Sequence, residues 1–227
     1  MTNLPTSIYG DKKIIRTTDG SFTFYSMGYN ESYKTKSVGA YTESLHKFVN
    51  GSNIINVLKH KDVRLLDICF GIGMNLAATA DKMVSDGCKG RLHAVSVELD
   101  YSLPYLVSQM PALFPCVGYN IIRKALKDGM CGNFSMELHL MNALKFIKEL
   151  SGKFDVIYFD PFSKKHNPEM WTDEVFSIMY NLLDDKGRLV TYASSKVIKE
   201  SMIKVGFKLT EVSSIGSRYQ PSLYAEK

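Results

Sequence analysis

The chain has 227 residues, of which 45% are hydrophobic, and its formal net charge at pH 7 is +5. This length and apolar content suit one domain with a substantial core, and the mild positive charge permits a polyanionic partner without demonstrating one. The N-terminus lacks a basic head followed by an apolar segment, and no apolar run approaches the roughly 18 residues of a membrane helix. We therefore expect a cytoplasmic protein that does not contact membranes.

The first predicted elements are a hairpin and a helix. Residues 12–27 (KKIIRTTDGSFTFYSM) alternate apolar and polar side chains around Asp19-Gly20, a dipeptide typical of two-residue hairpin turns. Residues 39–49 (GAYTESLHKFV) have helical spacing, and Gly51 is the expected end of that helix. We take residues 1–60 as an N-terminal extension and 61–227 as the core of a single domain.

From residue 61 onward, strand and helix patterns alternate, which predicts an α/β fold with a doubly wound, mostly parallel sheet of Rossmann-like type. Two short strands at the end of the chain are expected to form an antiparallel hairpin at one edge, making seven strands. Helices are predicted over 74–85, 119–128, 168–183 and 195–205, and strands over Val63–Ile68, Leu92–Val97, Met136–Met141, Phe154–Phe159, Arg188–Tyr192, Phe207–Glu211 and Leu223–Ala225.

The four cysteines, Cys69, Cys88, Cys116 and Cys131, are far apart and include no C-x-x-C pair. This spacing favours reduced thiols over a disulfide framework or a zinc site. We expect no metal, and we interpret Cys69 as a small buried side chain.

A glycine-containing turn follows the first strand of the core. In RLLDICFGIGMNLAATA, Gly71 and Gly73 come between a strand and a helix, where the backbone can approach a ligand and unpaired N–H groups are available. Glu98 ends the next strand, where a carboxylate can accept hydrogen bonds from ribose hydroxyls. A nucleoside ligand is one interpretation, and a simple tight turn is the other.

The third small residue of a dinucleotide fingerprint is absent, because Leu76 stands in its place, and pyrophosphate binding is therefore disfavoured. The run from Asp67 to Asn75, D-x-C-x-G-x-G-x-N, resembles the first motif of class I methyltransferases, although many members have glycine where this chain has Cys69. The resemblance implies S-adenosyl-L-methionine as the cofactor. It places Asp67, Gly71, Gly73 and Asn75 around the methionine part and Glu98 at the ribose.

The third core strand is followed by Asn142 and Ala143, at the position where class I methyltransferases usually have an acidic residue in contact with adenine. An amide oxygen can accept the same hydrogen bond, so the resemblance implies that Asn142 and Ala143 border the adenine. The other interpretation is that Asn142 caps the helix that begins with ALKFIKEL, and the two roles are compatible.

The fourth core strand ends in YFDPFSKKHNPEMWT, which places Asp160 at the carboxyl edge of the sheet, beside the glycine turn. An alkylamine with a pKa near about 10 is mostly protonated at neutral pH, and methyl transfer needs its neutral lone pair. Asp160 is a candidate to bind the ammonium, accept its proton or pass it to water. Phe162 is a candidate to stack on a flat substrate ring.

The longer run DPFSKKHNPEMWTDEVF resembles the signature of the MnmC-type methyltransferases, which complete the 5-methylaminomethyl group on the wobble uridine of certain tRNAs. The segments DGSFTFYS and GAYTESLHKFV also resemble the N-terminal hairpin and helix of that family, which implies that Tyr41 or Glu43 borders the cofactor pocket. Many members carry a C-terminal FAD-dependent oxidase, whereas this chain resembles a stand-alone form. We expect it to be a monomer.

The same run contains two groups whose roles differ. Lys164, Lys165 and His166 are expected to meet phosphates of the tRNA anticodon loop, or else to form an ordinary solvated loop. Asn167 is expected to cap the helix that follows, and Trp171 is interpreted as a core anchor rather than a base-stacking platform.

The leading hypothesis is a tRNA methyltransferase that acts on the 5-aminomethyl nitrogen of the wobble uridine (5-aminomethyl-2-thiouridine). A methyltransferase of small-molecule amines on the same fold is the first alternative. A non-catalytic tRNA-binding module is the second, and Gly71, Gly73, Glu98 and Asp160 argue against it. A nicotinamide-dependent oxidoreductase is disfavoured by Leu76.

Overall fold

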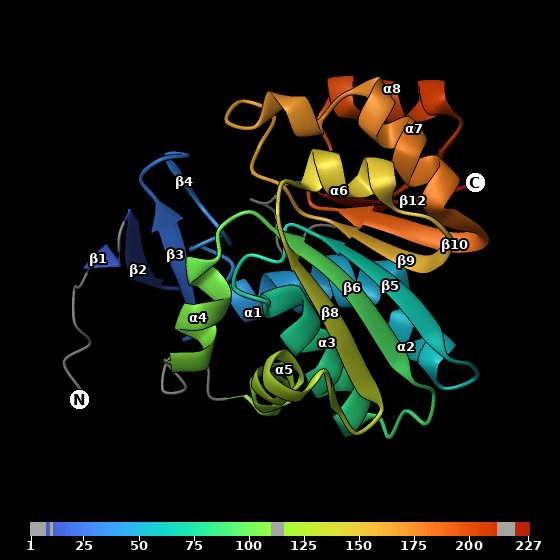
Figure 1. Cartoon of the computed structure of the whole chain (residues 1–227). Coiled ribbons are helices and arrows are strands. Elements are labelled where there is room, and N and C mark those ends of the chain that lie inside the picture. Colours follow the sequence, from blue (N-terminus) through green and yellow to red (C-terminus); the bar gives the residue numbers. More distant parts are fainter. Residues whose placement is uncertain (1–7, 10, 110–115, 213–220) are drawn as a thin grey trace.

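The computed structural model describes residues 8–9, 11–109, 116–212 and 221–227. Figure 1 shows a twisted sheet with helices on both faces and a second, smaller sheet beside one end of it. The doubly wound α/β fold predicted from the alternating patterns is confirmed. No helix in the described ranges is long and apolar enough to cross a bilayer.

The central sheet has the strand order β11-β12-β10-β9-β5-β6-β8-β7. Its parallel part comprises β5 (Val63–Ile68), β6 (Leu92–Glu98), β8 (Phe134–Leu140), β9 (Phe154–Phe159) and β10 (Leu183–Thr191). The edge hairpin predicted near the end of the chain is present as β11 (Lys208–Val212) and β12 (Ser222–Glu226). The prediction of seven strands omitted β7 (Met130–Cys131), which pairs with β8 for only two residues and is too short to leave a pattern.

Helices cover both faces of this sheet (Figure 1). One layer contains α2 (Ile54–Leu58), α3 (Met74–Ser85) and α5 (Val117–Asp128), and the other contains α6 (Ala143–Glu149), α7 (Asp173–Leu182) and α8 (Lys196–Val205). Val63 and Leu65 of β5 pack in the first core, whereas Leu66 and Ile68 pack in the second. The strand therefore carries apolar side chains on both of its faces, as expected for a strand buried on both sides.

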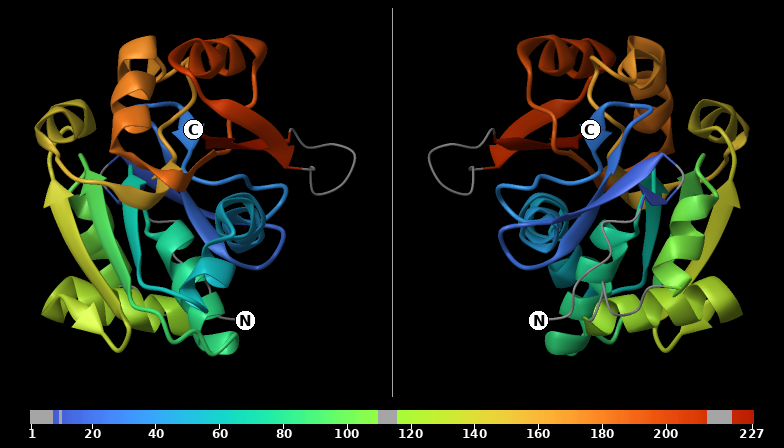
Figure 2. Two further views of the ribbon diagram at one scale, coloured as in Figure 1. Left: turned by 90° about the vertical axis from the view of Figure 1, so that its right-hand side faces the viewer. Right: turned by 90° about the vertical axis from the view of Figure 1, so that its left-hand side faces the viewer.

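The N-terminal sheet consists of β1 (Ile8–Tyr9), β2 (Lys12–Arg16), β3 (Phe22–Ser26) and β4 (Glu31–Ser32). Together with α4 (Ser102–Gln109) it lies at one end of the central sheet, and Figure 2 shows it in blue between the two helical layers. The predicted hairpin is therefore confirmed.

The predicted two-residue turn of this hairpin is wrong. Arg16 pairs with Phe22, so residues 17–21 form the loop, and only the glycine of Asp19-Gly20 has a positive φ. The Asp19 carboxylate instead accepts hydrogen bonds from the backbone N–H groups of Ser21 (3.0 Å) and Thr42 (2.9 Å). These bonds stabilise a wider loop that also holds the start of the next helix.

The helix after the N-terminal sheet is longer than predicted. It begins as α1 (Ala40–Glu43), continues as the π-helical segment η1 (Ser44–Asn50), and retains helical dihedrals at Gly51. Asn53, with φ +56°, is the residue that leaves the right-handed helix. Gly51 was a wrong end point, because asparagine tolerates the left-handed conformation as well.

The helix predicted over 168–183 is divided. A short 3-10 helix, η3 (Pro168–Met170), precedes α7, which begins after Thr172; the Thr172 hydroxyl accepts a hydrogen bond from Val175 N at 3.3 Å. Asn167 does not cap with its side chain, which instead donates to Glu169 Oε1 at 2.6 Å. Trp171 is 1% exposed and packs in the core, as predicted.

Candidate active site

A cavity lies at the carboxyl edge of the parallel strands, and the N-terminal sheet forms its opposite wall. From the core of the fold, the lining comes from the ends of the parallel strands and from the loops and helices that follow them: Cys69, Phe70, Gly71, Ile72, Met74, Val97, Glu98, Leu99, Asp100, Asn142, Ala143, Leu144, Asp160, Pro161, Phe162, Asn167, Glu169, Met170 and Tyr192. The residues that line it from the N-terminal region are Asp11, Ser26, Tyr29, Glu31, Ser32, Tyr33, Lys34, Thr35 and Glu43.

The glycine turn after β5 is joined directly to Glu98. Gly71 has φ +57°, and its N–H donates to Glu98 Oε2 at 2.7 Å, while Asp100 N donates to Oε1 at 2.8 Å. Gly73 has φ +69°, and a Cβ there would lie 2.5 Å from the Phe70 ring. Because a carboxylate has about four acceptor positions, Glu98 retains capacity for further donors from a ligand.

Asp67 lies below the cavity rather than on its surface. Its side chain is 1% exposed, Oδ2 accepts from Ser96 Oγ at 3.2 Å, and Oδ1 has no hydrogen-bond partner among the described residues. Burial, followed by the negative charge of Asp160, raises the pKa of Asp67 to about 7. The structure therefore places Asp67 beneath the expected methionine region, without a surface in the cavity.

This raised pKa predicts that the folded protein loses stability as pH rises, and that an Asp67→Asn variant does not show this loss. The folded protein holds a proton on Asp67 that the unfolded chain loses near 3.8, so stability from this group falls as pH rises towards about 7. We compare the free energy of unfolding of the variant with that of wild type. We expect this difference, variant minus wild type, to be more positive at about pH 8 than at about pH 5. Urea unfolding at both pH values checks this, and an equal difference at the two pH values would contradict it.

Asn142 caps α6 and also lines the cavity. Its Oδ1 accepts from Leu144 N (2.9 Å) and Lys145 N (3.2 Å), which confirms the capping alternative. These bonds occupy the oxygen expected to accept from the adenine amino group, and the adenine contact of Asn142 stays a prediction. The Nδ2 group is the part of this amide left for a ligand, as a donor. Ala143 also lines the cavity.

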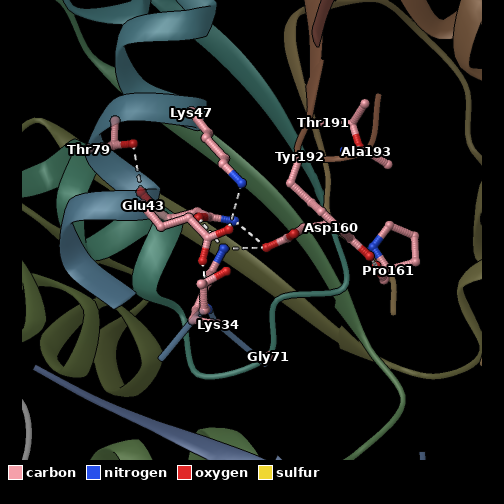
Figure 3. A network of polar contacts seen from close by, with 12 residues as sticks. Lys34, Glu43, Lys47, Gly71, Thr79, Asp160, Pro161, Thr191, Tyr192 and Ala193 are labelled. Carbon is pink, nitrogen blue, oxygen red and sulfur yellow. Dashed lines mark hydrogen bonds and ion pairs between the residues drawn. The ribbon is translucent and has the colours of Figure 1, made fainter. Parts of the chain in front are cut away.

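Asp160 stands at the centre of a polar network with residues from distant parts of the chain (Figure 3). Its Oδ2 accepts from Lys34 Nζ and from Asn75 Nδ2, the latter at 2.8 Å. Burial raises the pKa of Asp160, and the nearby Lys34 ammonium opposes that rise. Asn75, expected at the cofactor, is instead engaged with both Asp160 and Lys34.

Aromatic rings surround Phe162. Tyr29 stacks on it with ring centroids 4.4 Å apart and planes 23° apart, and Tyr33 lies 4.9 Å away at a tilt of 57°. Trp171 Nε1 donates to the Phe162 carbonyl at 2.8 Å, and the Tyr192 hydroxyl donates to the Pro161 carbonyl at 3.0 Å. A flat substrate ring would therefore meet an aromatic cluster on a backbone that two further side chains hold in place.

The N-terminal region supplies side chains that the sequence did not reveal as part of the site. Lys34 reaches Asp160 across 126 residues of chain, Lys12 pairs with Asp100, and Glu31 accepts from the Ser163 hydroxyl at 2.7 Å. No motif surrounds Lys34, and its role becomes visible only when the N-terminal sheet packs over the cavity.

Of the two N-terminal residues expected at the pocket, the structure places one there. Glu43 lines the cavity, accepting from Thr35 N at 2.7 Å and Lys47 Nζ at 3.0 Å. Tyr41 lies outside the cavity lining, and its hydroxyl donates to Asp81 Oδ2 on α3 at 2.7 Å. Helical spacing turns these two side chains towards different neighbours.

The cavity is anionic although the whole chain is positively charged. Lys34 is the one cationic side chain among the described residues that line it. The acidic side chains in the lining are Asp11, Glu31, Glu43, Glu98, Asp100, Asp160 and Glu169. Such a lining favours ligands with positive charge, such as sulfonium or ammonium groups.

The basic residues after β9 lie outside the cavity. Lys164 and Lys165 are exposed and His166 is half-buried, in a turn where His166 N donates to Ser163 O at 2.8 Å. Because Ser163 is bound to Glu31 and Phe162 lines the cavity, this turn is adjacent to the site.

The geometry at Glu98 predicts that Glu98→Gln weakens nucleoside binding. The substituted amide replaces one acceptor oxygen by an NH₂ group, which cannot accept from Gly71 N or Asp100 N. We expect affinity for S-adenosylhomocysteine, the nucleoside probe, to fall about ten- to a hundredfold in calorimetry. Glu137→Gln, an exposed change on β8, is the control, and equal affinity of wild type and Glu98→Gln would contradict the prediction.

Comparisons with known proteins agree with this geometry. A family model described as "S-adenosyl-L-methionine-dependent methyltransferase" matches residues 119–226. The crystal structure of MnmC2 from Aquifex aeolicus is similar with a TM-score of 0.81 and 31% identity, covering 95% of this chain and 70% of that one. Spermidine synthase from Thermotoga maritima, at 14% identity and a TM-score of 0.61, shares the fold, covering 94% of this chain and 67% of that one.

Relatives found by sequence are longer proteins. The "tRNA 5-methylaminomethyl-2-thiouridine biosynthesis bifunctional protein MnmC" of Paraburkholderia phymatum is 27% identical over 86% of this chain, which spans 32% of that protein. An uncharacterized protein of Methanocaldococcus jannaschii is 25% identical over 90% of this chain, which spans 57% of its length.

Proposed function

Because this chain belongs to the MnmC-type S-adenosyl-L-methionine-dependent methyltransferases, we propose that it methylates the 5-aminomethyl nitrogen of the tRNA wobble uridine, giving 5-methylaminomethyl uridine. The name of the Paraburkholderia relative, which concerns tRNA 5-methylaminomethyl-2-thiouridine biosynthesis, supports this substrate. The observation that carries the proposal is Asp160, a carboxylate in the cavity next to the Gly71 turn, with Phe162 beside it.

The lining of the cavity offers groups that suit S-adenosyl-L-methionine. Gly71 would approach the methionine part with its backbone, Glu98 would accept from ribose hydroxyls with its spare lone pairs, and Asn142 and Ala143 would border the adenine. When bound, this cofactor supplies a methyl group on a positively charged sulfur, and the amine nitrogen takes that methyl as the C–S bond breaks. The acidic lining stabilises such a cation.

Asp160 would hold the substrate amine. Its carboxylate can accept a hydrogen bond from the nitrogen, orient the lone pair, and take the proton that the nitrogen loses or pass it to water. Phe162, with Tyr29 and Tyr33, would contact the uracil ring. Lys164, Lys165 and His166 would meet the phosphates of the anticodon loop beside the cavity.

The acidic lining also favours a second candidate, a small cationic amine as the methyl acceptor. The two are distinguished by incubating the protein with methyl-labelled S-adenosyl-L-methionine and either bulk tRNA from cells blocked at the final methylation or a set of small alkylamines. The proposal predicts label in precipitated RNA and little label in the amines. Label in the amines with none in RNA would favour the second candidate, and label in neither would contradict both.

A further inference from the structure

Lys34 is buried in the site and is held by contacts within the protein. It is 7% exposed, and its Nζ contacts Asp160 Oδ2, donates to Asn75 Oδ1 at 2.8 Å, and lies 4.5 Å from the centroid of the Phe48 ring. Two of these contacts use N–H donors of the ammonium, and the third is a cation–π contact with the Phe48 ring. Lys34 is therefore bound to the protein rather than left available for a ligand.

The orientation of Asn75 follows from its two neighbours. A lysine can only donate and a carboxylate can only accept, so Oδ1 of Asn75 faces Lys34 and Nδ2 faces Asp160. Oδ2 of Asp160 thus receives hydrogen bonds from both Lys34 and Asn75. Among the described residues, Oδ1 of Asp160 has no hydrogen-bond partner, although Asp160 lines the cavity.

We propose that Lys34 is a positioning residue of the methyl-transfer site, which together with Asn75 holds Oδ2 of Asp160 and leaves Oδ1 as the oxygen that receives the substrate amine. This inference rests on the proposed function, because it assigns the partner of that amine. It also gives a role to the N-terminal region that packs over the cavity. The segment after β4 delivers the cation that fixes the carboxylate.

The charges around Asp160 come from several elements. Lys34 follows β4, Glu43 ends α1 and pairs with Lys47 of η1, and Asp67 lies on β5. Cys69 and Tyr192 also face the Asp160 carboxylate. Burial raises the pKa of Asp160 and Lys34 opposes that rise, so loss of the ammonium would raise the pKa further. A protonated Asp160 cannot take the proton of the amine. As pH falls, a protein without the Lys34 ammonium would therefore lose activity at a higher pH than wild type does.

The test uses Lys34→Gln, whose amide can still donate to Asp160 but carries no charge. We expect the acidic limb of the kcat profile to move to higher pH by about one to three units, and Lys34→Arg, which restores the charge, to move it back. Lys61→Gln is the control, because Lys61 is a surface lysine paired with Asp155 instead of Asp160. It should leave the titration of Asp160 unchanged.

A second readout does not depend on any substrate. Carbon-13 NMR of the Asp160 carboxyl in the ligand-free protein should show the same upward movement of its titration midpoint in Lys34→Gln, and a midpoint equal to that of wild type would overturn the proposal even if the protein methylates tRNA. If the variant does not fold, wild type is used alone. Its Lys34 Nζ resonance should shift as Asp160 titrates, and a resonance that does not shift would overturn the proposal. Absence of methyl transfer by wild type, with the NMR result as expected, would reject the proposed function alone.

Discussion

Asp160→Asn is expected to lower kcat by at least about a hundredfold, because an amide of the same size cannot take a proton from the substrate amine. Asparagine can still accept from Lys34 through its oxygen, so the buried ammonium keeps a partner and the fold is retained. Alanine would leave Lys34 buried without a carboxylate, which costs about 3–5 kcal/mol. The asparagine variant therefore separates the chemistry from stability better than alanine does.

Calorimetry with S-adenosylhomocysteine checks that the asparagine variant still binds the nucleoside. We expect binding to be kept, because Gly71 and Glu98 bond to each other and not to Asp160. Asp155→Asn is the control, because Asp155 lies on β9, the strand that ends just before Asp160, and pairs with Lys61 at the surface. Turnover of Asp160→Asn within about tenfold of wild type would exclude a proton-accepting role for Asp160.

Trp171→Ala is expected to lower the free energy of unfolding by about 3–5 kcal/mol, as large aromatic truncations in cores do. Trp171 is 1% exposed, and its ring lies 5.2 Å from that of Phe159 and 6.0 Å from that of Tyr192. Urea unfolding measures the loss. Tyr105→Ala, a change at an exposed aromatic of α4, should alter stability by about 0.5 kcal/mol or less.

Trp171→Phe separates packing from positioning. Phenylalanine fills much of the space but cannot donate to the Phe162 carbonyl. We therefore expect Trp171→Phe to lower turnover clearly, while its free energy of unfolding falls less than that of Trp171→Ala. Wild-type turnover in Trp171→Phe would show that this hydrogen bond does not position Phe162, and a loss below about 1 kcal/mol in Trp171→Ala would contradict the core role.

The parts of the fold that the sequence predicted best are those with strong local patterns. The strands at Val63–Ile68 and Phe154–Phe159 and the helix at 74–85 were predicted with the observed bounds, because apolar runs and the glycine turn delimit them. Gly51 was misread because Asn53 takes the left-handed conformation in its place, and Asp19-Gly20 was misread because the Asp19 carboxylate binds the backbone N–H of Thr42, far along the chain.

The site was predicted only where it follows strand ends. Gly71, Glu98, Asn142 and Asp160 come together because parallel strands end at one edge of the sheet. Lys34 could not be predicted, since a single lysine in a loop has no pattern and its partner is 126 residues away. The family resemblance indicated that the N-terminal region borders the pocket, but it did not identify which side chain reaches Asp160.

The most direct test of the account is nucleoside mass spectrometry on tRNA from cells blocked at the final methylation, after incubation with S-adenosyl-L-methionine and either wild-type or Asp160→Asn protein. The account predicts that wild type produces 5-methylaminomethyl uridine with a matching loss of the aminomethyl precursor, and that the variant leaves the precursor in place. Two results would contradict it: a precursor left unchanged by wild-type protein that binds S-adenosylhomocysteine, or equal conversion by wild type and variant.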